Sequence, residues 1–434
     1  MQAISNNPTH SRGQFASPIP VALAAGLAVL GLWCRAQADV VIDWSEALYQ
    51  FNAPLDLGGA PPTGESRGYA MVHIAMYQAI NQANRTHQSH SASPEAAAAQ
   101  AAHDVAASVF DKTAFDALLA SELAAIPNGP AKANGIAIGA QAAADMLADR
   151  ANDGAAAYNV PSFFPDYTPG PNPGDYQFTA PYNFAFAVKW GSVTPFVLKS
   201  GSQFRVPPPY KVTDLTYTFD VNEIKALGSL NSVGRTDDQS QLAVFWWESA
   251  PLGWNRIARL LVAQHSGDLT SNALLFAVLN AAIADAGIAS WDSKYTYNFW
   301  RPISAIREVI PDGNNLTTPD PNWEPLADLV TVTRTPPIPD YPSAHAAFGG
   351  AASTVLAAFF GDENTFSYTS TMSQLFPSVQ PRTFHRLSEA AYENAISRVM
   401  VGIHFRLACV KGYEQGVQVG NWAVKHFQTK GQDE

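Results

Sequence analysis

Three separate segments of the chain combine cationic side chains, hydroxyl groups and histidines, the residue types that bind oxyanions and move protons. In the first segment, Lys294 and Arg301 are seven residues apart, so a helix would carry both cations on one face. Pro302 disfavours helical geometry at the residue before it, which predicts a kink or a helix end that lets the Arg301 side chain lean into a cavity. Taken alone, such a pair of cations is also typical of a solvent-exposed helix face.

The second segment, PSAH at residues 342–345, opens an apolar stretch that predicts a helix from Ala344 to Phe360. Ser343 is a favourable N-cap residue, and the free amides of the first turn form a ready anion site. His345 lies in the same turn, so its imidazole would face a bound anion. A single histidine at a helix start is, by itself, more typical of a structural residue.

The third segment contains Ser397, Arg398 and His404, with Gly402 between them. Arg398 and His404 are six residues apart, which places them about 120° away from a common face on an ideal helix. Either the long arginine reaches around the helix, or the helix distorts near Gly402. Ser397 and His404 do share a face. In isolation this segment would predict only a surface arginine and a structural histidine.

Taken in order, the motifs K-x6-R-P, P-S-A-H and S-R-x5-H resemble the signature of one superfamily. This superfamily unites the vanadium-dependent haloperoxidases with type-2 phosphatidic acid phosphatases and bacterial acid phosphatases. Other segments resemble its soluble, secreted haloperoxidase-like branch: MVHIAMYQAIN near residue 71, SPEAAAAQAAHDV near 93, FWWESAPLGWNRIAR near 245 and WDSKYTYNFWRPISAIR near 291. The resemblance covers most of the chain and implies a fold of packed helical bundles.

The resemblance also implies a role for each motif residue. The groups that would hold the nonbridging oxygens of a tetrahedral phosphate or vanadate are Lys294, Arg301, Arg398, Ser343 and the backbone amide of Ala344. His404 would be the apical residue, either the covalent metal ligand of vanadate or the nucleophile of a phosphatase. His345 would be the acid–base partner across from it.

Several positions depart from the usual pattern of the superfamily or extend it. Ala344 stands where the motif usually has glycine; it keeps the amide but adds a methyl group beside the oxyanion. Ala408 stands four residues after His404, where many members have an aspartate, so a backbone carbonyl or another side chain must orient the second ring nitrogen. Glu248 falls where relatives often have an acid near the acid–base histidine, and we expect it to support His345.

The shared pocket leaves two activities open. Trp291 matches an aromatic residue that lines the halide side in some haloperoxidases, whereas Ile338 stands where haloperoxidases tend to have an aromatic residue or histidine. Chain length and the wider similarity favour a vanadate-dependent haloperoxidase that oxidises halide with hydrogen peroxide at a histidine-bound vanadate. The alternative is a secreted acid phosphatase that cleaves phosphomonoesters through a phosphohistidine, with phosphate in the same site. A phosphate-binding scaffold without activity is a third interpretation.

The composition indicates a globular chain with a large core. Hydrophobic residues make up 47% and charged residues 15%, which excludes disorder as the main state. The 37 acidic and 26 basic side chains give a net charge of −11, which repels a polyphosphate backbone and argues against nucleic acid as a partner. The expected partners are small molecules, namely halide and peroxide or a phosphomonoester. Nothing in the sequence indicates an oligomeric state.

Alanine-rich helical patterns dominate the chain and predict an all-α fold. Helices are expected at residues 67–83, from 94 onward, and at 112–126, 131–149, 238–248, 252–266, 271–300, 344–360, 388–405 and 413–427. Strand alternation is nearly absent, although Thr213–Val221 (TDLTYTFDV) is compatible with a short hairpin arm. Three histidines on predicted helices, His73, His103 and His265, have no partner at metal-ligand spacing and are expected to be structural.

Residues 154–210 differ in character from the rest, with clusters such as PDYTPGPNPGDY and VPPPY that cannot sustain helices. The aromatic content of this segment argues for order. It fits either a wall or lid over a site or a linker between two helical bundles. The chain is therefore divided into an N-terminal helical region, 39–235, which includes this segment, and a C-terminal bundle, 236–434, which carries the motifs.

The first 38 residues predict a signal peptide. An uncharged apolar run at residues 21–32 precedes Ala36-Gln37-Ala38, an A-x-A site of the kind that signal peptidase accepts. The run is well short of the roughly 20 residues of a membrane-spanning helix, so a membrane anchor is the less favoured interpretation. We expect cleavage near Ala38 and a secreted or periplasmic protein without a stable membrane anchor. Cleavage would also remove Cys34 and leave Cys409 as an unpaired thiol.

Overall fold

The structure is a computed structural model that describes residues 39–57, 61–85, 92–158, 167–330 and 335–430. The predicted signal peptide, residues 1–38, lies outside the described residues. The longer elements, in chain order, are α1 (Val40–Leu57), α2 (Pro62–Arg85), α3 (Pro94–Val109), α4 (Asp116–Ala125), α5 (Pro130–Arg150), α6 (Leu215–Leu227), α7 (Asp237–Phe245), α8 (Ala250–His265), α9 (Leu269–Tyr297), α10 (Pro302–Ile306), α11 (Ala327–Val330), α12 (Ala344–Phe360), β1 (Glu363–Tyr368), β2 (Arg382–Arg386), α13 (Leu387–Met400) and α14 (Arg406–Lys430). The predicted all-α fold is confirmed, with one small antiparallel pair of strands, β1 and β2, among the described residues.

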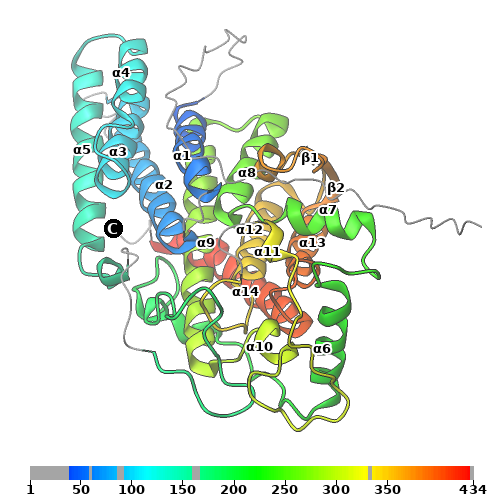
Figure 1. Ribbon diagram of the computed structural model, residues 1–434. Helices are drawn as coiled ribbons and strands as arrows, with labels where there is room; N and C mark the ends of the chain where they lie inside the picture. Colours follow the sequence, from blue (N-terminus) through cyan, green and yellow to red (C-terminus); the bar gives the residue numbers. More distant parts are fainter. Residues whose placement is uncertain (1–38, 58–60, 86–91, 159–166, 331–334, 431–434) are drawn as a thin grey trace, which may run out of the picture. The chain divides into compact units, whose positions relative to one another are not determined.

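The long helix α9 is the element on which helices from both halves of the chain pack, including α2, α12 and α14 (Figure 1). It begins after Asp268, whose carboxylate accepts the Ser271 amide at 2.8 Å. It ends at Asn298, which adopts a left-handed conformation with φ 49°. Within the described part of the chain it is the one helix long and apolar enough to cross a membrane, but 94% of its most apolar window is buried in the protein. This burial is typical of a core helix, and it places Lys294, in the last turn, at the end of a rigid element.

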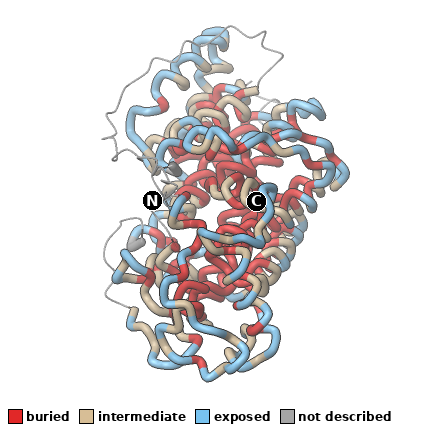
Figure 2. Tube along the Cα trace, turned by 45° about the vertical axis from the view of Figure 1, so that its right-hand side comes forward, coloured by how far each residue is buried: buried red, intermediate tan, exposed pale blue. Residues whose placement is uncertain are grey.

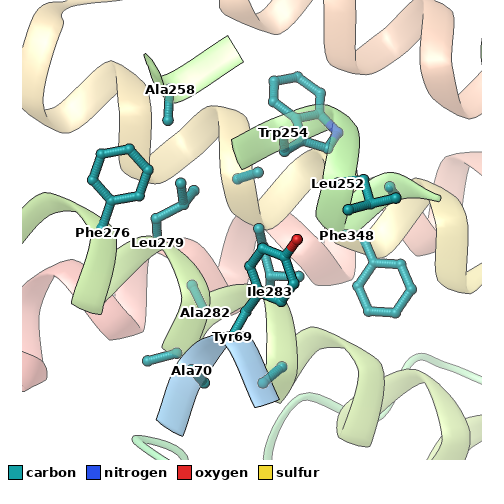
Figure 3. Packing of buried hydrophobic residues seen from close by; sticks show 14 of the residues in the cluster. Tyr69, Ala70, Leu252, Trp254, Ala258, Phe276, Leu279, Ala282, Ile283 and Phe348 are labelled. Carbon is teal, nitrogen blue, oxygen red and sulfur yellow. The ribbon is translucent and has the colours of Figure 1, made fainter. Parts of the chain in front are cut away.

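The core forms where α9 meets the surrounding helices. Figure 2 shows buried residues concentrated on the inner helices and exposed residues on the outer turns and loops. In Figure 3, Tyr69 and Ala70 of α2 lie beside Ala282 and Ile283 of α9, and all four side chains are fully buried. Complete burial of a large apolar side chain stabilises a fold by about 1.5–3 kcal/mol, so this interface ties the N-terminal helices firmly to α9.

A stripe of glycines on α14 allows this helix to approach α12 closely. Gly412, Gly416 and Gly420 recur once per helical turn. A Cβ atom at Gly412 would overlap the carbonyl oxygen of Ser343, and one at Gly416 would overlap that of Ala347. The two backbones are therefore in direct contact, and the contact at Ser343 fixes the N-terminus of α12 against α14.

The predicted hairpin arm at Thr213–Val221 is wrong, because most of this segment belongs to helix α6. The sequence that alternates like a strand also places Tyr217, Val221 and Ile224 on one helical face. All three side chains are buried in a second apolar cluster. Burial of this face therefore decides between two patterns that the short segment satisfies equally well.

The predicted helix over residues 388–405 is shorter than the sequence indicates. Helix α13 ends at Met400, and Gly402 adopts φ 87°, a left-handed conformation that ends a helix. Helix α14 then begins at Arg406, earlier than the sequence predicts. Of the two arrangements that the spacing left open, the structure forms the distorted one, and His404 lies in the turn between the helices.

Two of the histidines expected to be structural have ordinary partners. His73 is fully buried, and its Nδ1 atom lies 2.8 Å from the carbonyl oxygen of Tyr69. Burial lowers the pKa of His73 to about 4. The ring nitrogens of His103 lie 2.8 and 2.9 Å from the carboxylates of Asp104 and Asp116. Burial opposes protonation of His103, but these carboxylates outweigh it and raise its pKa.

Candidate active site

Helix ends from distant parts of the sequence carry the residues that the three motifs single out. Lys294 lies in the last turn of α9, and Arg301 directly precedes α10. Ser343 caps α12, and His404 occupies the turn between α13 and α14. Contacts among these residues and their loops, described below, bring the three motifs together.

Lys294 joins the first motif to the loop before α12. Its side chain is fully buried, and Nζ donates to the carbonyl oxygens of Pro339 at 2.7 Å and Asp340 at 3.0 Å. An ammonium group has three protons, so one remains for a ligand. Burial, and then the charge of Arg301, lower the pKa of Lys294 well below its usual range. A bound anion would act in the opposite direction and favour the charged form.

Arg301 joins the first motif to the third. Its Nε atom donates to the Ile338 carbonyl oxygen at 2.7 Å, and Nη1 donates to that of Ile403 at 2.8 Å. Nη1 also lies 3.0 Å from Nε2 of His404. The remaining nitrogen, Nη2, is buried and has no hydrogen-bond partner within the described part of the chain. Because an unsatisfied buried donor is costly, this nitrogen indicates a place for an acceptor from outside the chain.

Ser343 forms the N-cap that the sequence predicts. Its backbone is extended, with φ −72° and ψ 115°, and Oγ accepts the Ala346 amide at 3.4 Å. The Ser343 amide donates to the Ala408 carbonyl oxygen at 2.9 Å, which ties the second motif to α14. Amides in the first turn of a helix, such as that of Ala344, have no partner within the helix, and the helix dipole favours negative charge near them. The N-terminus of α12 therefore suits an anion.

Arg398 and His345 form an electrostatically coupled pair. Nη2 of the buried Arg398 donates to the Trp246 carbonyl oxygen at 2.8 Å, and Nε donates to Ser397 Oγ at 3.0 Å. Burial lowers the pKa of Arg398 to about 9. His345 is partly exposed as a residue, but its Nε2 atom is covered and has no hydrogen-bond partner among the described residues. Burial, and then the Arg398 charge, lower the pKa of His345 well below its usual range, so a neutral imidazole is available to exchange protons.

Asp340 provides the group beside His404 that the sequence left unassigned. Its Oδ1 atom lies 2.8 Å from Nδ1 of His404 and 4.0 Å from Nη1 of Arg301. Ala408, at the position where many family members have an aspartate, is fully buried and supplies only its backbone carbonyl. The sequence analysis missed Asp340. The available signal was an acid just before the PSAH motif in a chain that lacks the acid at 408.

The site contains more buried positive than negative charge. Lys294, Arg301 and Arg398 are each at most 3% exposed, and among the described residues Asp340 places a carboxylate oxygen 4.0 Å from Arg301. Burial raises the pKa of Asp340 to about 7, while Arg301 and Lys294 act in the opposite direction. Burial, and then the charge of Arg301, lower the pKa of His404 well below its usual range. Uncompensated charge in a buried site is costly, so the residues present fit an oxyanion.

Glu248 does not make the contact that the sequence predicts. Its carboxylate accepts the Thr371 amide at 2.7 Å and the Thr371 hydroxyl at 2.9 Å, and it pairs with Arg256 at 3.2 Å. These bonds hold the turn at Thr371 and leave no described hydrogen bond to His345. Within the same segment it is the backbone carbonyl of Trp246 that acts on His345 and raises its pKa, against the larger effect of burial.

Trp291 and Ile338 are both buried. Trp291 is close to the first motif in sequence, and Ile338 contacts it. Trp291 lies one helical turn before Lys294, and its Nε1 atom has no hydrogen-bond partner in the described ranges. Ile338 contributes its carbonyl oxygen to Arg301. The assignment of Trp291 to the halide side of the site stays a prediction.

The irregular segment packs against the site, which favours a wall over a linker. The Tyr176 amide donates to the Asn298 carbonyl oxygen at 2.7 Å, and the Trp300 amide donates to that of Gly174 at 2.8 Å. These bonds lie directly before Arg301. Further along, the segment also bonds to the loop that precedes α12. It therefore contacts the chain beside both the first and the second motif.

The helical fold is similar to that of vanadium-dependent peroxidases of known structure. The structure is similar to that of a bacterial vanadium-dependent iodoperoxidase, with a TM-score of 0.74, 25% sequence identity and coverage of 89% of this chain and 96% of that chain. A bacterial vanadium-dependent chloroperoxidase in its holo form shares the fold, with a TM-score of 0.66, 18% identity and coverage of 86% and 94%.

Sequence comparisons lead to the same relationship. Residues 274–433 match the family model for the second helical-bundle domain of VCPO. Vanadium chloroperoxidase of Curvularia inaequalis is 27% identical over 302 residues, which cover 56% of this chain and 48% of that protein. The chain thus spans about half the length of this curated relative. The chain is similar to vanadium haloperoxidases in sequence and fold, as the three motifs predict.

Proposed function

We propose that this protein is a vanadate-dependent haloperoxidase, which uses hydrogen peroxide to oxidise halide. The observation that carries the proposal is the excess of buried positive charge around Arg301, whose Nη2 atom lacks an acceptor in the described part of the chain. An oxyanion would supply that acceptor and offset the charge. The relatives described above are vanadium-dependent peroxidases, which supports vanadate in preference to phosphate.

In this proposal each motif residue holds the cofactor or moves a proton. The groups that would hold the oxygens of vanadate are Lys294, Arg301, Arg398, Ser343 and the Ala344 amide, with His404 as the metal ligand. When bound, vanadate would supply the Lewis acidity that activates hydrogen peroxide toward halide. Because only an unprotonated imidazole nitrogen ligates a metal, the lowered pKa of His404 suits this role.

His345 is the proposed base for the incoming hydrogen peroxide. Its Nε2 atom is buried without a partner among the described residues, so a lone pair or a proton there faces no competing group. Burial and the nearby Arg398 disfavour the protonated ring. A His345 ring that has taken a proton from peroxide would therefore release it easily. Repeated turnover requires this release, because the base must return to its neutral form.

Vanadate reconstitution tests the proposal. Purified protein is incubated with vanadate, bound vanadium is measured by mass spectrometry, and oxidation of iodide and bromide by hydrogen peroxide is followed by absorbance. We expect halide oxidation only after reconstitution, its loss in His404→Ala, and inhibition by added phosphate. His385→Ala is the matched control, because His385 is exposed on β2.

Hydrolysis of p-nitrophenyl phosphate is measured on the same preparations. A protein that takes up no vanadium but hydrolyses this ester would establish the acid phosphatase alternative. Full halide oxidation in His404→Ala would contradict the assignment of His404, whichever activity is present.

A further inference from the structure

We propose that Asp340 is the positioning residue of His404, holding the proton on Nδ1 so that Nε2 is the ligating nitrogen. This inference rests on the proposed function in one respect, namely that Nε2 of His404 ligates the vanadium of vanadate. Asp340 would thereby replace the aspartate that many relatives carry four residues after the apical histidine, where this chain has Ala408.

The contacts of His404 support one arrangement of its ring proton. Nη1 of Arg301 lies 3.0 Å from Nε2 and 3.4 Å from Nδ1, and a guanidinium group can only donate, so the nearer nitrogen, Nε2, is the better placed acceptor. Nδ1 then carries the proton, and it lies 2.8 Å from Oδ1 of Asp340. A carboxylate accepts such a proton, so the two neighbours select the same tautomer.

The Nδ1 contact is short but poorly aligned, since among the described residues it is an ion-pair contact without the geometry of a linear hydrogen bond. Catalytic hydrogen bonds are often loose in the absence of the bound ligand and tighten when it binds. A small rotation of the ring would align the Nδ1 proton with Oδ1. Once Nε2 ligates vanadium, its contact with Arg301 no longer constrains the orientation of the ring.

Asp340 is itself held in place by its backbone on both sides. Its amide donates to the Phe299 carbonyl oxygen at 2.8 Å, and its own carbonyl oxygen accepts Nζ of Lys294 at 3.0 Å. The side chain is fully buried. The carboxylate therefore has little freedom to leave His404, as positioning of a metal ligand requires.

The position of Ala408 allows a direct test by transfer of the carboxylate. Ala408 is fully buried in the first turn of α14, four residues after His404. An aspartate there would approach the same imidazole from α14 instead of from the loop before α12. The double variant Asp340→Ala/Ala408→Asp therefore restores a carboxylate without restoring Asp340.

The experiment measures vanadate and phosphate affinity by calorimetry for the wild type, Asp340→Ala, the double variant and Asp285→Asn. Asp285 is the matched control, because it is equally buried but accepts the amides of Phe196, Val197 and Leu198. We expect Asp340→Ala to bind vanadate about ten- to a hundredfold more weakly, the usual effect of losing a supporting contact to a metal ligand. Phosphate affinity should hold or rise, because a nearby negative charge is removed.

A pocket that is merely disordered by the substitution would lose both anions together, and that outcome would overturn the proposal. The double variant should regain most of the vanadate affinity, and Asp285→Asn should leave the ratio of the two affinities unchanged.

Nitrogen-15 NMR of labelled histidine provides a readout without any anion: wild-type His404 should carry its proton on Nδ1. A proton on Nε2 would overturn the proposal as well. If the wild type binds vanadate no better than phosphate, the proposed function fails, while the NMR result still decides the role of Asp340.

Discussion

The contact between α14 and the N-terminus of α12 sets the distance between the second and third motifs. At Gly412 a Cβ atom would overlap the Ser343 carbonyl oxygen. That oxygen belongs to the backbone and cannot rotate away, so Gly412→Ala must push the two helices apart. Ser343 and His345 move with α12, whereas His404 directly precedes α14. The substitution therefore separates groups that the proposed site needs together.

The expected magnitudes differ between stability and binding. Ordinary contact distances require a separation on the order of 1 Å, because close-packed interiors offer no free space. Overpacking costs roughly 1–3 kcal/mol, and alanine is favoured over glycine in a helix by about 1 kcal/mol, which leaves a net destabilisation of about 0–2 kcal/mol. A displacement of about 1 Å at a catalytic site can, however, reduce rates about a hundredfold.

Gly420→Ala provides the control for this prediction. Gly420 lies on the same stripe, and its Cβ atom would come within 2.7 Å of the Ala351 carbonyl oxygen. It is eight residues further along α14, roughly 12 Å from Gly412, so its displacement falls away from the site. Thermal unfolding and vanadate calorimetry are measured on both variants. We expect comparable, modest losses of stability, with weakened vanadate binding and turnover in Gly412→Ala alone.

Two results would refute this reasoning. The first is a Gly412→Ala variant that is destabilised but binds vanadate like the wild type, which would mean that the spacing of α12 and α14 does not set the site. The second is a Gly420→Ala variant that loses as much vanadate affinity as Gly412→Ala. The effect would then reflect general loosening of the helix pair.

Further outcomes follow from the site charges, the buried histidines and the leader sequence. Arg398→Gln should weaken vanadate or phosphate binding roughly ten- to a hundredfold by calorimetry, since a charge-assisted hydrogen bond contributes on the order of 1.5–3 kcal/mol; unchanged affinity would exclude Arg398 from the site. The pKa of His73 falls from an ordinary value near 6.5 to about 4 in the folded state, so stability should be lost as pH falls through this range, by about 3 kcal/mol at most. Urea unfolding of His73→Gln at pH 7.5 and 4.5 should show a smaller pH dependence than the wild type. The pKa of His103 is raised, so its contribution is fully present below about pH 6.5 and is lost at higher pH; His103→Gln should therefore destabilise the protein more at pH 5.5 than at pH 8.5. Finally, exported protein should begin at Asp39, and an intact mass that retains residues 1–38 would contradict the predicted cleavage.

Much of the fold was predictable because its helices have strong local signals. The apolar stretch of α9 and the Ser343 cap of α12 each identify an element without reference to the rest of the chain. The segment at Thr213–Val221 has no such signal, because its apolar residues fit both periodicities. Packing against residues such as Trp300 and Phe405, which are distant in sequence, selects the helix.

The residue types of the site were predictable, but their partners were not. The three motifs supplied the cations and histidines, since these must be present for any oxyanion chemistry. Asp340 was missed, and the expected contact between Glu248 and His345 is not formed. Both contacts depend on where a loop directs a side chain. The FWWES turn directs Glu248 to Thr371, and the loop before α12 directs Asp340 to His404. Spacing along the sequence contains no information about either direction.

The shared use of α9 limits how far this protein can be divided into parts. The residues that match the second helical-bundle domain of VCPO begin at 274, inside α9, so the matched region has no boundary that avoids the helix. A fragment made from those residues alone would lose α2, which covers side chains such as Ala282 and Ile283. An uncovered apolar helix of this length is prone to aggregate or to enter a membrane. Transplanting or shuffling the matched region therefore requires that α2 be carried with it, or that the exposed face of α9 be redesigned with polar residues.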